Sequence, residues 1–235
     1  MKENSFIEEL KKLNIEIDED KLNKLRIYAD FLMEYNTHTN LTAIRDIDSI
    51  YLKHFYDSIL VSKYFDFSNV TSLIDIGTGA GFPGVILKIF FPNIDVVLLD
   101  SNNKKINFLN ELIEKLSLKG IIAINDRAEN YVINNRQKFD VSIARAVSEL
   151  RVIAELCLPL TKTSGHFIAM KSNYEYELEK ANRTLKHLNS SIENIYETEL
   201  PIENSLRSFI IFKVNQNIDI KYPRAYDQIL KKELK

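Results

Sequence analysis

Residues 72–84 read SLIDIGTGAGFPG, an apolar run that ends in an acid and passes into alternate glycines. Glycine accepts positive φ angles and has no Cβ, so the backbone of such a loop can approach a bound molecule and donate N–H groups to it. Pro83 stands where the first turn of a helix tolerates a residue without an N–H. The stretch therefore predicts a strand, a tight ligand-binding loop and a helix.

A second apolar run, residues 96–99, ends in Asp100. Doubly wound nucleotide-binding folds keep a carboxylate at this strand end, where it accepts hydrogen bonds from ribose hydroxyls. The two strand ends together predict a nucleoside pocket. Asp75 has two interpretations, since it either contacts the ligand or caps backbone donors at the end of its strand. Asp100 also has a structural alternative, as a helix N-terminal residue favoured by the helix dipole.

The glycine pattern by itself allows two nucleotide-binding classes. Residues 79–84 satisfy the G-x-G-x-x-G dinucleotide fingerprint. Residues 75–81, D-x-G-x-G-x-G, resemble the first motif of S-adenosylmethionine-dependent methyltransferases. The end of the chain favours the second class, because residues 192–196 and 209–214 form two strand patterns with no helix between them. Such a pair after alternating strands and helices is typical of the seven-stranded methyltransferase fold.

From residue 72 onward, strand and helix patterns alternate, which predicts a parallel sheet with right-handed crossovers. We expect an α/β protein with the seven-stranded class I S-adenosylmethionine-dependent methyltransferase (Rossmann-like) fold and an N-terminal helical extension. Within the extension, helices are expected to start near Asp18 and to cover residues 49–64, with a polar loop at residues 36–42. The expected parts are the helical extension 1–68, the methyltransferase domain 69–216 and a basic C-terminal tail 217–235.

Composition limits the class of protein. Hydrophobic residues at 45% and charged residues at 27% are ordinary for a soluble globular chain. The net charge of −2 gives no overall basic field, so a nucleic-acid partner must meet a local patch. One cysteine, Cys157, fits a reducing compartment, and four scattered histidines give no metal constellation. With neither a signal peptide nor a membrane-spanning run, we expect a cytoplasmic monomer without metal or membrane partner.

Several short motifs follow one another in a defined order. They are NLT at 40–42, H-x-x-D-S at 54–58, DIGTGAGFPG at 75–84, LDS at 99–101, RAE at 127–129, ARA at 144–146 and YPR at 222–224. In this order and spacing the chain resembles the ribosomal RNA small-subunit methyltransferase G family, from about residue 36 to the tail. The resemblance implies S-adenosylmethionine-dependent methylation of a guanine N7 in 16S ribosomal RNA or the small-subunit ribosomal particle. Residues 170–172, MKS, depart from the family's more usual lysine followed by glycine.

The resemblance also implies which residues bind the cofactor. The expected set is Gly77, Gly79, Gly81, Phe82, Asp100, Ala128, Glu129 and Arg145. Gly77, Phe82, Ala128-Glu129 and Arg145 are carried over by motif, and Asp100 as the ribose ligand follows from the wider methyltransferase class. We expect the Arg145 guanidinium to point toward the cofactor carboxylate or an RNA phosphate, where its planar fork pairs well.

No catalytic acid, base or nucleophile is expected. Methylation of exocyclic amines uses an Asn/Asp-Pro-Pro-aromatic loop after the fourth strand, where this chain has ARA at 144–146. Methylation of a pyrimidine carbon needs a nucleophilic cysteine, whereas Cys157 falls in an apolar helix and suits the core. Guanine N7 carries a free lone pair, so its attack needs positioning and a dry pocket rather than a base.

Other residues have both structural and functional interpretations. His54 and Asp57, three apart on a helix, predict a contact that fixes the extension on the domain. Lys171 is either solvated or in contact with phosphate. The tail is either a solvated end or an RNA-binding arm, in which Tyr222 and Tyr226 offer stacking surface.

Two other functions stay open, because function belongs to the site rather than to the fold. They are a class I methyltransferase that acts on a small molecule or a protein, and a nucleotide-binding module without catalysis. RNA is favoured by basic residues expected at the carboxyl edge of the sheet, which are Arg45, Arg127, Arg145 and Lys171.

Overall fold

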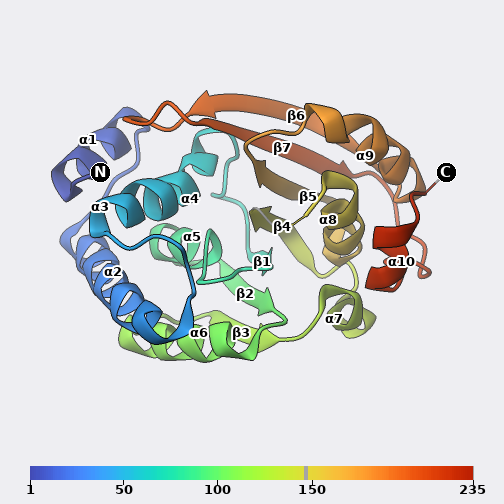
Figure 1. Ribbon diagram of the computed structural model, residues 1–235. Coiled ribbons are helices and arrows are strands. Elements are labelled where there is room, and N and C mark those ends of the chain that lie inside the picture. The colour runs from blue at the N-terminus through green and yellow to red at the C-terminus, as the bar shows by residue number, and fades with distance from the viewer. Residues whose placement is uncertain (146–147, 235) are drawn as a thin grey trace.

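The computed structural model describes residues 1–145 and 148–234, and within them the strands form one seven-stranded sheet in the order β3-β2-β1-β4-β5-β7-β6 (Figure 1). The strands are β1 Ser72–Ile76, β2 Asp95–Asp100, β3 Ile121–Asn125, β4 Phe139–Arg145, β5 Thr161–Lys171, β6 Ser190–Glu199 and β7 Leu206–Val214. Neighbouring strands from β3 to β5 pair in parallel, whereas β7 is antiparallel to β5 and β6. The predicted fold class is confirmed. Ala146 of the ARA motif and Lys235 of the tail lie outside the described residues.

Helices precede, connect and follow the strands. Before the sheet lie α1 Glu3–Lys12, α2 Glu19–Thr39, α3 Ile47–Ile50, the π-helical turn η1 Tyr51–Tyr56, α4 Asp57–Ile59 and the 3-10 turn η2 Leu60–Lys63. Between strands lie α5 Gly84–Phe90, α6 Asn103–Lys115, α7 Ala128–Asn135, α8 Leu150–Cys157, the 3-10 turn η3 Leu158–Leu160 and α9 Glu175–His187, and α10 Tyr226–Lys231 follows β7. Within the described part of the chain, no helix combines the length and the apolar character needed to cross a membrane.

The predicted start of α2 is confirmed by its cap, but the predicted loop at residues 36–42 is only partly right. The helix expected at residues 49–64 begins two residues earlier, at Ile47, and consists of α3, η1, α4 and η2 in succession. Asp18 caps α2 by accepting a hydrogen bond from the Lys21 N–H at 2.8 Å. The helix then continues to Thr39, whose hydroxyl donates to the carbonyl four residues earlier at 2.8 Å. Such a bond satisfies a threonine inside a helix. Asn40 ends the helix at a φ of +51°, in the left-handed region that asparagine tolerates.

The sheet is covered on both faces, so side chains of each strand enter two hydrophobic clusters. On β1, Leu73 packs in one cluster and Ile74 in the other, because successive strand side chains point to opposite faces. Figure 1 shows α1 to α6 on one side of the sheet and α7 to α10 on the other. The parallel strands are therefore buried on both faces, and a ligand can reach them only at the edges where the connecting loops lie.

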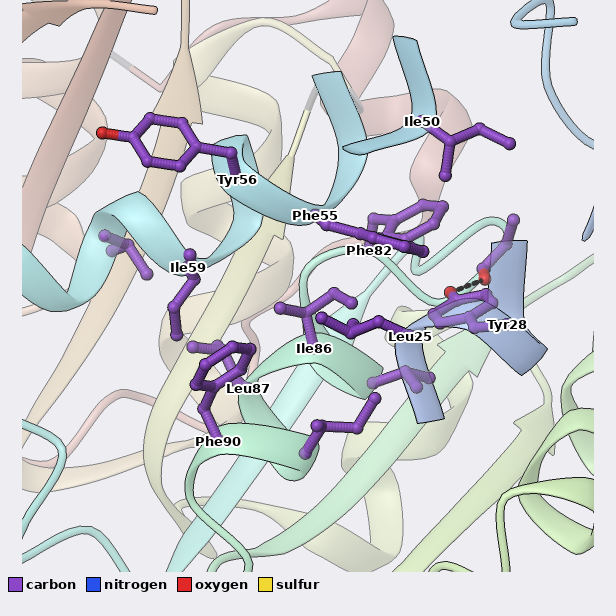
Figure 2. Packing of buried hydrophobic residues seen from close by; sticks show 14 of the residues in the cluster. Leu25, Tyr28, Ile50, Phe55, Tyr56, Ile59, Phe82, Ile86, Leu87 and Phe90 are labelled. Carbon is purple, nitrogen blue, oxygen red and sulfur yellow. Dashed lines mark hydrogen bonds between the residues drawn. The ribbon is translucent and has the colours of Figure 1, made fainter. Parts of the chain in front are cut away.

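The helical extension shares its core with the sheet domain. Figure 2 shows Tyr28 of α2, Phe55 of η1 and Phe82 of the glycine loop packed together beside Ile86 of α5. The Tyr28 and Phe82 rings stack with centroids 5.2 Å apart and planes 10° apart. The Tyr28 hydroxyl also donates a hydrogen bond to the carbonyl of Ala80. The extension is thus fixed directly on the loop that follows β1.

Candidate functional site

The glycine loop leaves β1 at the carboxyl edge of the sheet and turns into α5. Gly77 donates its N–H to the carbonyl of Leu99 at 2.8 Å, which ties the loop to the end of β2. Gly79 and Gly81 have φ angles of +63° and +100°, where side chains are rarely found. A Cβ on Gly81 would also lie only 2.8 Å from the Tyr28 hydroxyl. The loop therefore needs glycine for its backbone conformation and for its packing against the extension.

Asp75 holds this loop in place. Its Oδ2 accepts hydrogen bonds from the Thr78 hydroxyl at 2.7 Å and from the Gly84 N–H at 2.8 Å. The side chain is fully buried, and among the described residues its Oδ1 has no hydrogen-bond partner. Of the two interpretations, the capping of backbone donors is the one these contacts bear out. Burial raises the pKa of Asp75 to about 6, because the two hydrogen bonds and the charge of Arg145 offset desolvation only in part.

Asp75→Asn is expected to change how stability varies with pH. A carboxyl whose pKa rises to about 6 on folding keeps its proton between about pH 4 and pH 6. Its contribution to stability therefore falls as pH rises through this range, by about 3 kcal/mol. Asparagine does not titrate, so the free energy of unfolding of the variant should rise by about 3 kcal/mol relative to that of the wild type between pH 4 and pH 7. Urea denaturation followed by circular dichroism would measure the difference.

The wild-type curve alone would not isolate Asp75, because His54 acts in the opposite direction. Burial, and then the charge of Arg145, lower the pKa of His54 to about 3, so its contribution to stability rises with pH up to about 6.5. That contribution is common to both proteins and cancels in their difference. A difference that stays constant with pH would show that Asp75 does not titrate at a raised pKa.

Asp100 ends β2 and faces the space beside the glycine loop. Its Oδ2 accepts the Gly79 N–H at 3.0 Å, and its Oδ1 accepts the Asn102 N–H at 2.9 Å. Lys105 approaches Oδ2 at 3.3 Å. The Asn102 side chain caps α6 by accepting the Lys104 N–H at 3.0 Å. Asp100 thus supports both loops and still presents its carboxylate to a cavity.

This first cavity has a volume of about 390 Å³, within the range of roughly 300–1,000 Å³ that is usual for small-molecule sites. Its lining includes five of the expected cofactor residues, which are Gly77, Asp100, Ala128, Glu129 and Arg145. Gly79, Gly81 and Phe82 were also expected there, but they do not line it. These three residues shape the loop through other contacts. Gly79 donates its N–H to Asp100, Gly81 lies beside Tyr28, and the Phe82 ring stacks on Tyr28 and His54.

Arg145, at the end of β4, is held by the helical extension. Its Nη1 donates to the carbonyl of Lys53 at 3.0 Å and to Asp57 Oδ2 at 3.1 Å. Its guanidinium lies over the Phe82 ring, 5.2 Å from the ring centroid. The guanidinium is therefore paired within the protein, whereas its expected contact with a cofactor carboxylate or an RNA phosphate stays a prediction. The sequence did not show that a helical segment 88 residues earlier supplies the carboxylate.

His54 lies beside Arg145 as a neutral ring. Its Nδ1 is 3.1 Å from Arg145 Nη2, and its Nε2 is 2.9 Å from the Thr42 hydroxyl. Because an arginine has no acceptor, Nδ1 must accept and Nε2 must carry the proton. The imidazole also stacks on Phe82, with centroids 4.3 Å apart. His54 therefore connects the extension to β4 and the glycine loop.

Asp57 joins two strands of the sheet to the extension. Besides Arg145, it accepts a hydrogen bond from Arg207 Nε of β7 at 2.8 Å on its other oxygen. Only 4% of Asp57 is exposed, so the carboxylate is almost fully removed from water. The predicted structural role of His54 and Asp57 in fixing the extension is confirmed, but the hydrogen bonds that do so run through Arg145 and Arg207.

A second cavity, of about 340 Å³, is also lined by Arg145. Three of its lining residues, Lys53, His54 and Asp57, belong to the extension. The rest come from the end of β4, the end of β5 with the residue that follows it, and the start of β7; they are Arg145, Met170, Lys171, Ser172, Arg207, Ser208 and Phe209. Arg145 thus lines both cavities. The second cavity combines buried apolar side chains with cationic groups, a mixture that suits a planar base and its phosphate.

The other basic residues of interest are mostly engaged within the protein. Lys171 donates to the carbonyl of Ser148 at 3.0 Å and forms an ion pair with Glu177. This contact favours a structural role over the phosphate contact. Arg45 donates to the carbonyl of Asn36 at 3.0 Å and so holds the turn after α2.

The segment after β7 packs against the sheet domain. Tyr222 is buried, so it cannot stack on RNA as one interpretation required. Arg224 donates to both oxygens of Glu155, at 2.8 and 2.7 Å. Tyr226 lines the first cavity, which the sequence did not predict, because nothing in the tail's composition shows where it folds back. Cys157 is buried as expected, and no cluster among the described residues has the side chains to hold a metal.

Comparisons with known proteins show the family to which this chain is related. The family model described as GidB: rRNA small subunit methyltransferase G matches residues 21–205. The chain is 44% identical over 227 residues to the Ribosomal RNA small subunit methyltransferase G of Lysinibacillus sphaericus, with 95% of each chain covered. It is 44% identical over 221 residues to that of Acetivibrio thermocellus, covering 93% of this chain and 91% of the relative.

Among solved structures, a SAM dependent methyltransferase from Aquifex aeolicus has the same fold. The TM-score is 0.53 at 15% sequence identity, over 72% of this chain and 94% of that chain. At this identity the likeness concerns the fold alone.

Proposed function

The chain belongs to the rRNA small subunit methyltransferase G family, and from this we propose that it transfers the methyl group of S-adenosylmethionine to N7 of a guanine in 16S ribosomal RNA. The observation that carries the proposal is that Arg145 lines both cavities. Ligands in the two cavities would therefore both contact one side chain. A methyl donor and its acceptor need this proximity.

The first cavity fits S-adenosylmethionine, which supplies an electrophilic methyl group on a sulfonium. Asp100 accepts hydrogen bonds from the ribose hydroxyls, as the carboxylate at this strand end does in nucleotide-binding folds. Ala128 and Glu129, after β3, contact the base end of the nucleoside. Gly77 allows the close approach of the loop, and Arg145 bounds the end of the cavity nearest β4.

The second cavity receives the guanine. Met170 and Phe209 are buried apolar residues that face the base, and Arg207 lies where the cavity can accept a phosphate. Sequence-specific proteins usually read RNA bases that are unstacked in this way. The target guanine enters from a single-stranded or opened segment of the ribosomal RNA.

The residues around Arg145 suit attack by a neutral nitrogen. N7 becomes positively charged as it accepts the methyl group, so an uncompensated cation beside the ring would oppose the reaction. Asp57 is shared by Arg145 at 3.1 Å and Arg207 at 2.8 Å, so it offsets one of these two charges, and the RNA phosphate placed at Arg207 would offset the other. His54 adds no charge because its pKa is lowered to about 3. The protein positions the base and excludes water, and no proton has to be removed from N7.

Methyl transfer to ribosomal particles tests the proposal. Small-subunit particles that lack N7 methylation would be incubated with S-adenosylmethionine carrying a radiolabelled methyl group, with large-subunit particles as the control. Label should enter 16S RNA only, and borohydride and aniline, which cleave RNA at 7-methylguanosine, should cut at the labelled nucleotide. Label in a protein or a small molecule, or labelled RNA that resists this cleavage, would contradict the proposal.

Asp100→Ala is expected to weaken S-adenosylmethionine binding by roughly tenfold to a hundredfold, because charge-assisted hydrogen bonds to the ribose are lost. Isothermal titration calorimetry would measure the affinity. Asp95→Ala is a matched control, since it removes an exposed carboxylate from the opposite end of β2. Unchanged affinity in a folded Asp100→Ala variant would mean that the ribose lies elsewhere.

A further inference from the structure

Tyr226 is held in a fixed position by the contacts of the segment around it. Two residues before it, Arg224 forms hydrogen bonds with Glu155 of α8, which is almost fully buried. Its backbone N–H donates at 3.0 Å, and its guanidinium N–H groups donate to both carboxylate oxygens. Three residues after it, Ile229 is buried and its carbonyl accepts a hydrogen bond from Arg151 Nη1 at 2.6 Å. Figure 1 shows α10 beside α8, close to α7. The tail is thus anchored on both sides of Tyr226.

The Tyr226 side chain lines the first cavity, at the end formed after β3. The Arg127 guanidinium lies over its ring, with the ζ carbon 5.5 Å from the ring centroid. Arg127 immediately precedes α7, and its neighbours Ala128 and Glu129 line the same cavity. Tyr226 and the loop after β3 therefore form one wall of the cavity.

The order of the strands shows which part of the cofactor meets this wall. The sheet has β2 between β1 and β3, so Asp100 lies between the glycine loop and the loop after β3. Arg145, at the end of β4, bounds the cavity on the far side of β1. With the ribose at Asp100 and the reacting methyl group toward Arg145, the adenine extends toward β3. It then meets Arg127 and Tyr226.

We propose that Tyr226 is a cofactor-binding residue whose aromatic ring packs against the adenine, with Arg127 positioning that ring. The inference rests on the cofactor of the proposed function but not on its RNA substrate. It also gives the tail a role at the cofactor site, whereas the sequence suggested only a solvated end or an RNA-binding arm.

Stacking of a base on an aromatic side chain has a measurable size. Removing one such contact commonly weakens binding by roughly 5- to 150-fold. Tyr226→Ala should lower affinity within this range, whereas Tyr226→Phe keeps the ring and should bind within about twofold of the wild type. Tyr176→Ala is the matched control, because Tyr176 on α9 is 95% exposed and lies outside both cavities.

Calorimetric titration with two ligands separates the adenine from the rest of the cofactor. S-adenosylhomocysteine is the whole unreactive product, and 5′-methylthioadenosine keeps the adenosine but lacks the amino-acid end. Tyr226→Ala should weaken both by a similar factor. Affinities equal to those of Tyr176→Ala would overturn the proposal, and so would a loss confined to S-adenosylhomocysteine, because it would place Tyr226 at the amino-acid end.

A fluorescence readout checks the contact without removing an aromatic ring. The sequence contains no tryptophan, so Tyr226→Trp would introduce a single indole at the proposed contact. Its emission should change on addition of 5′-methylthioadenosine and saturate with the calorimetric Kd, whereas Tyr176→Trp should not respond. An indole that does not respond in a Tyr226→Trp protein that binds the ligand would overturn the proposal. If ribosomal particles are not methylated but these results hold, only the proposed RNA substrate is wrong.

Discussion

Asp57→Ala is expected to lower the free energy of unfolding by about 3–5 kcal/mol, the usual cost of removing one partner from a buried ion pair. Asp57 is 4% exposed and is bonded to Arg145 and Arg207, whose side chains are 15% and 20% exposed. Without the carboxylate, both guanidinium groups keep their charge in a poorly solvated place. The helical extension would also lose its hydrogen bond to Arg207 of β7 and one of its hydrogen bonds to Arg145 of β4.

Glu203→Ala is the matched control for Asp57→Ala. Glu203 pairs with Lys53 at 2.9 Å, but both side chains are more than a third exposed. Surface pairs of this kind contribute about 0–1 kcal/mol. Urea denaturation followed by circular dichroism would compare the two variants. A loss of less than 1 kcal/mol in Asp57→Ala would show that solvent or another side chain reaches the arginines readily.

Gly81→Ala is expected to lower the free energy of unfolding by about 2–5 kcal/mol. Part of the loss comes from its φ of +100°, which an alanine adopts only with strain. The rest comes from crowding, since the new Cβ would lie 2.6 Å from Val85 Cγ2 and 2.8 Å from the Tyr28 hydroxyl. Either Tyr28 or the loop would have to move.

Gly79→Ala separates strain from crowding in the same loop. Gly79 also has a positive φ, +63°, but the nearest atom to its added Cβ is 4.0 Å away. Only backbone strain remains, so about 1–2 kcal/mol should be lost. Denaturation curves of the two variants, recorded under identical conditions, would give the comparison. Equal losses of unfolding free energy in the two variants would show that the residues around Gly81 move easily to accept a Cβ and that Tyr28 is not tightly packed there.

Most of the fold was predictable because local signals and the sheet pattern agree. The strand before the glycine loop, the strand end at Asp100, the cap at Asp18 and the final antiparallel pair were expected from the sequence and are confirmed. The first of these strands continues one residue beyond Asp75, to Ile76. The end of α2 was misjudged by a few residues, because Thr39 bonds to its own helix and only Asn40 leaves it. Propensity cannot distinguish these two outcomes for a polar stretch.

The candidate site was predictable where it depends on strand ends and unpredictable where it depends on distant contacts. Asp100 follows its strand directly, so its place at the cavity could be inferred from the sequence. The partners of Arg145 come from helical segments 88 to 92 residues earlier. Arg224 pairs with Glu155, which lies 69 residues before it. Pairings of this kind arise from tertiary packing, which leaves no local pattern. Tyr226 was missed at the first cavity for this reason.

The two cavities differ in their origin along the chain. The lining of the first comes entirely from residue 76 onward, whereas Lys53, His54 and Asp57 of the second belong to the extension. On the proposed assignment, the sheet domain and tail recognise the donor, and the extension contributes to recognition of the acceptor. A change in the first 68 residues would therefore act directly on the acceptor cavity, and on the donor cavity only through Arg145 and the glycine loop, which the extension holds in place.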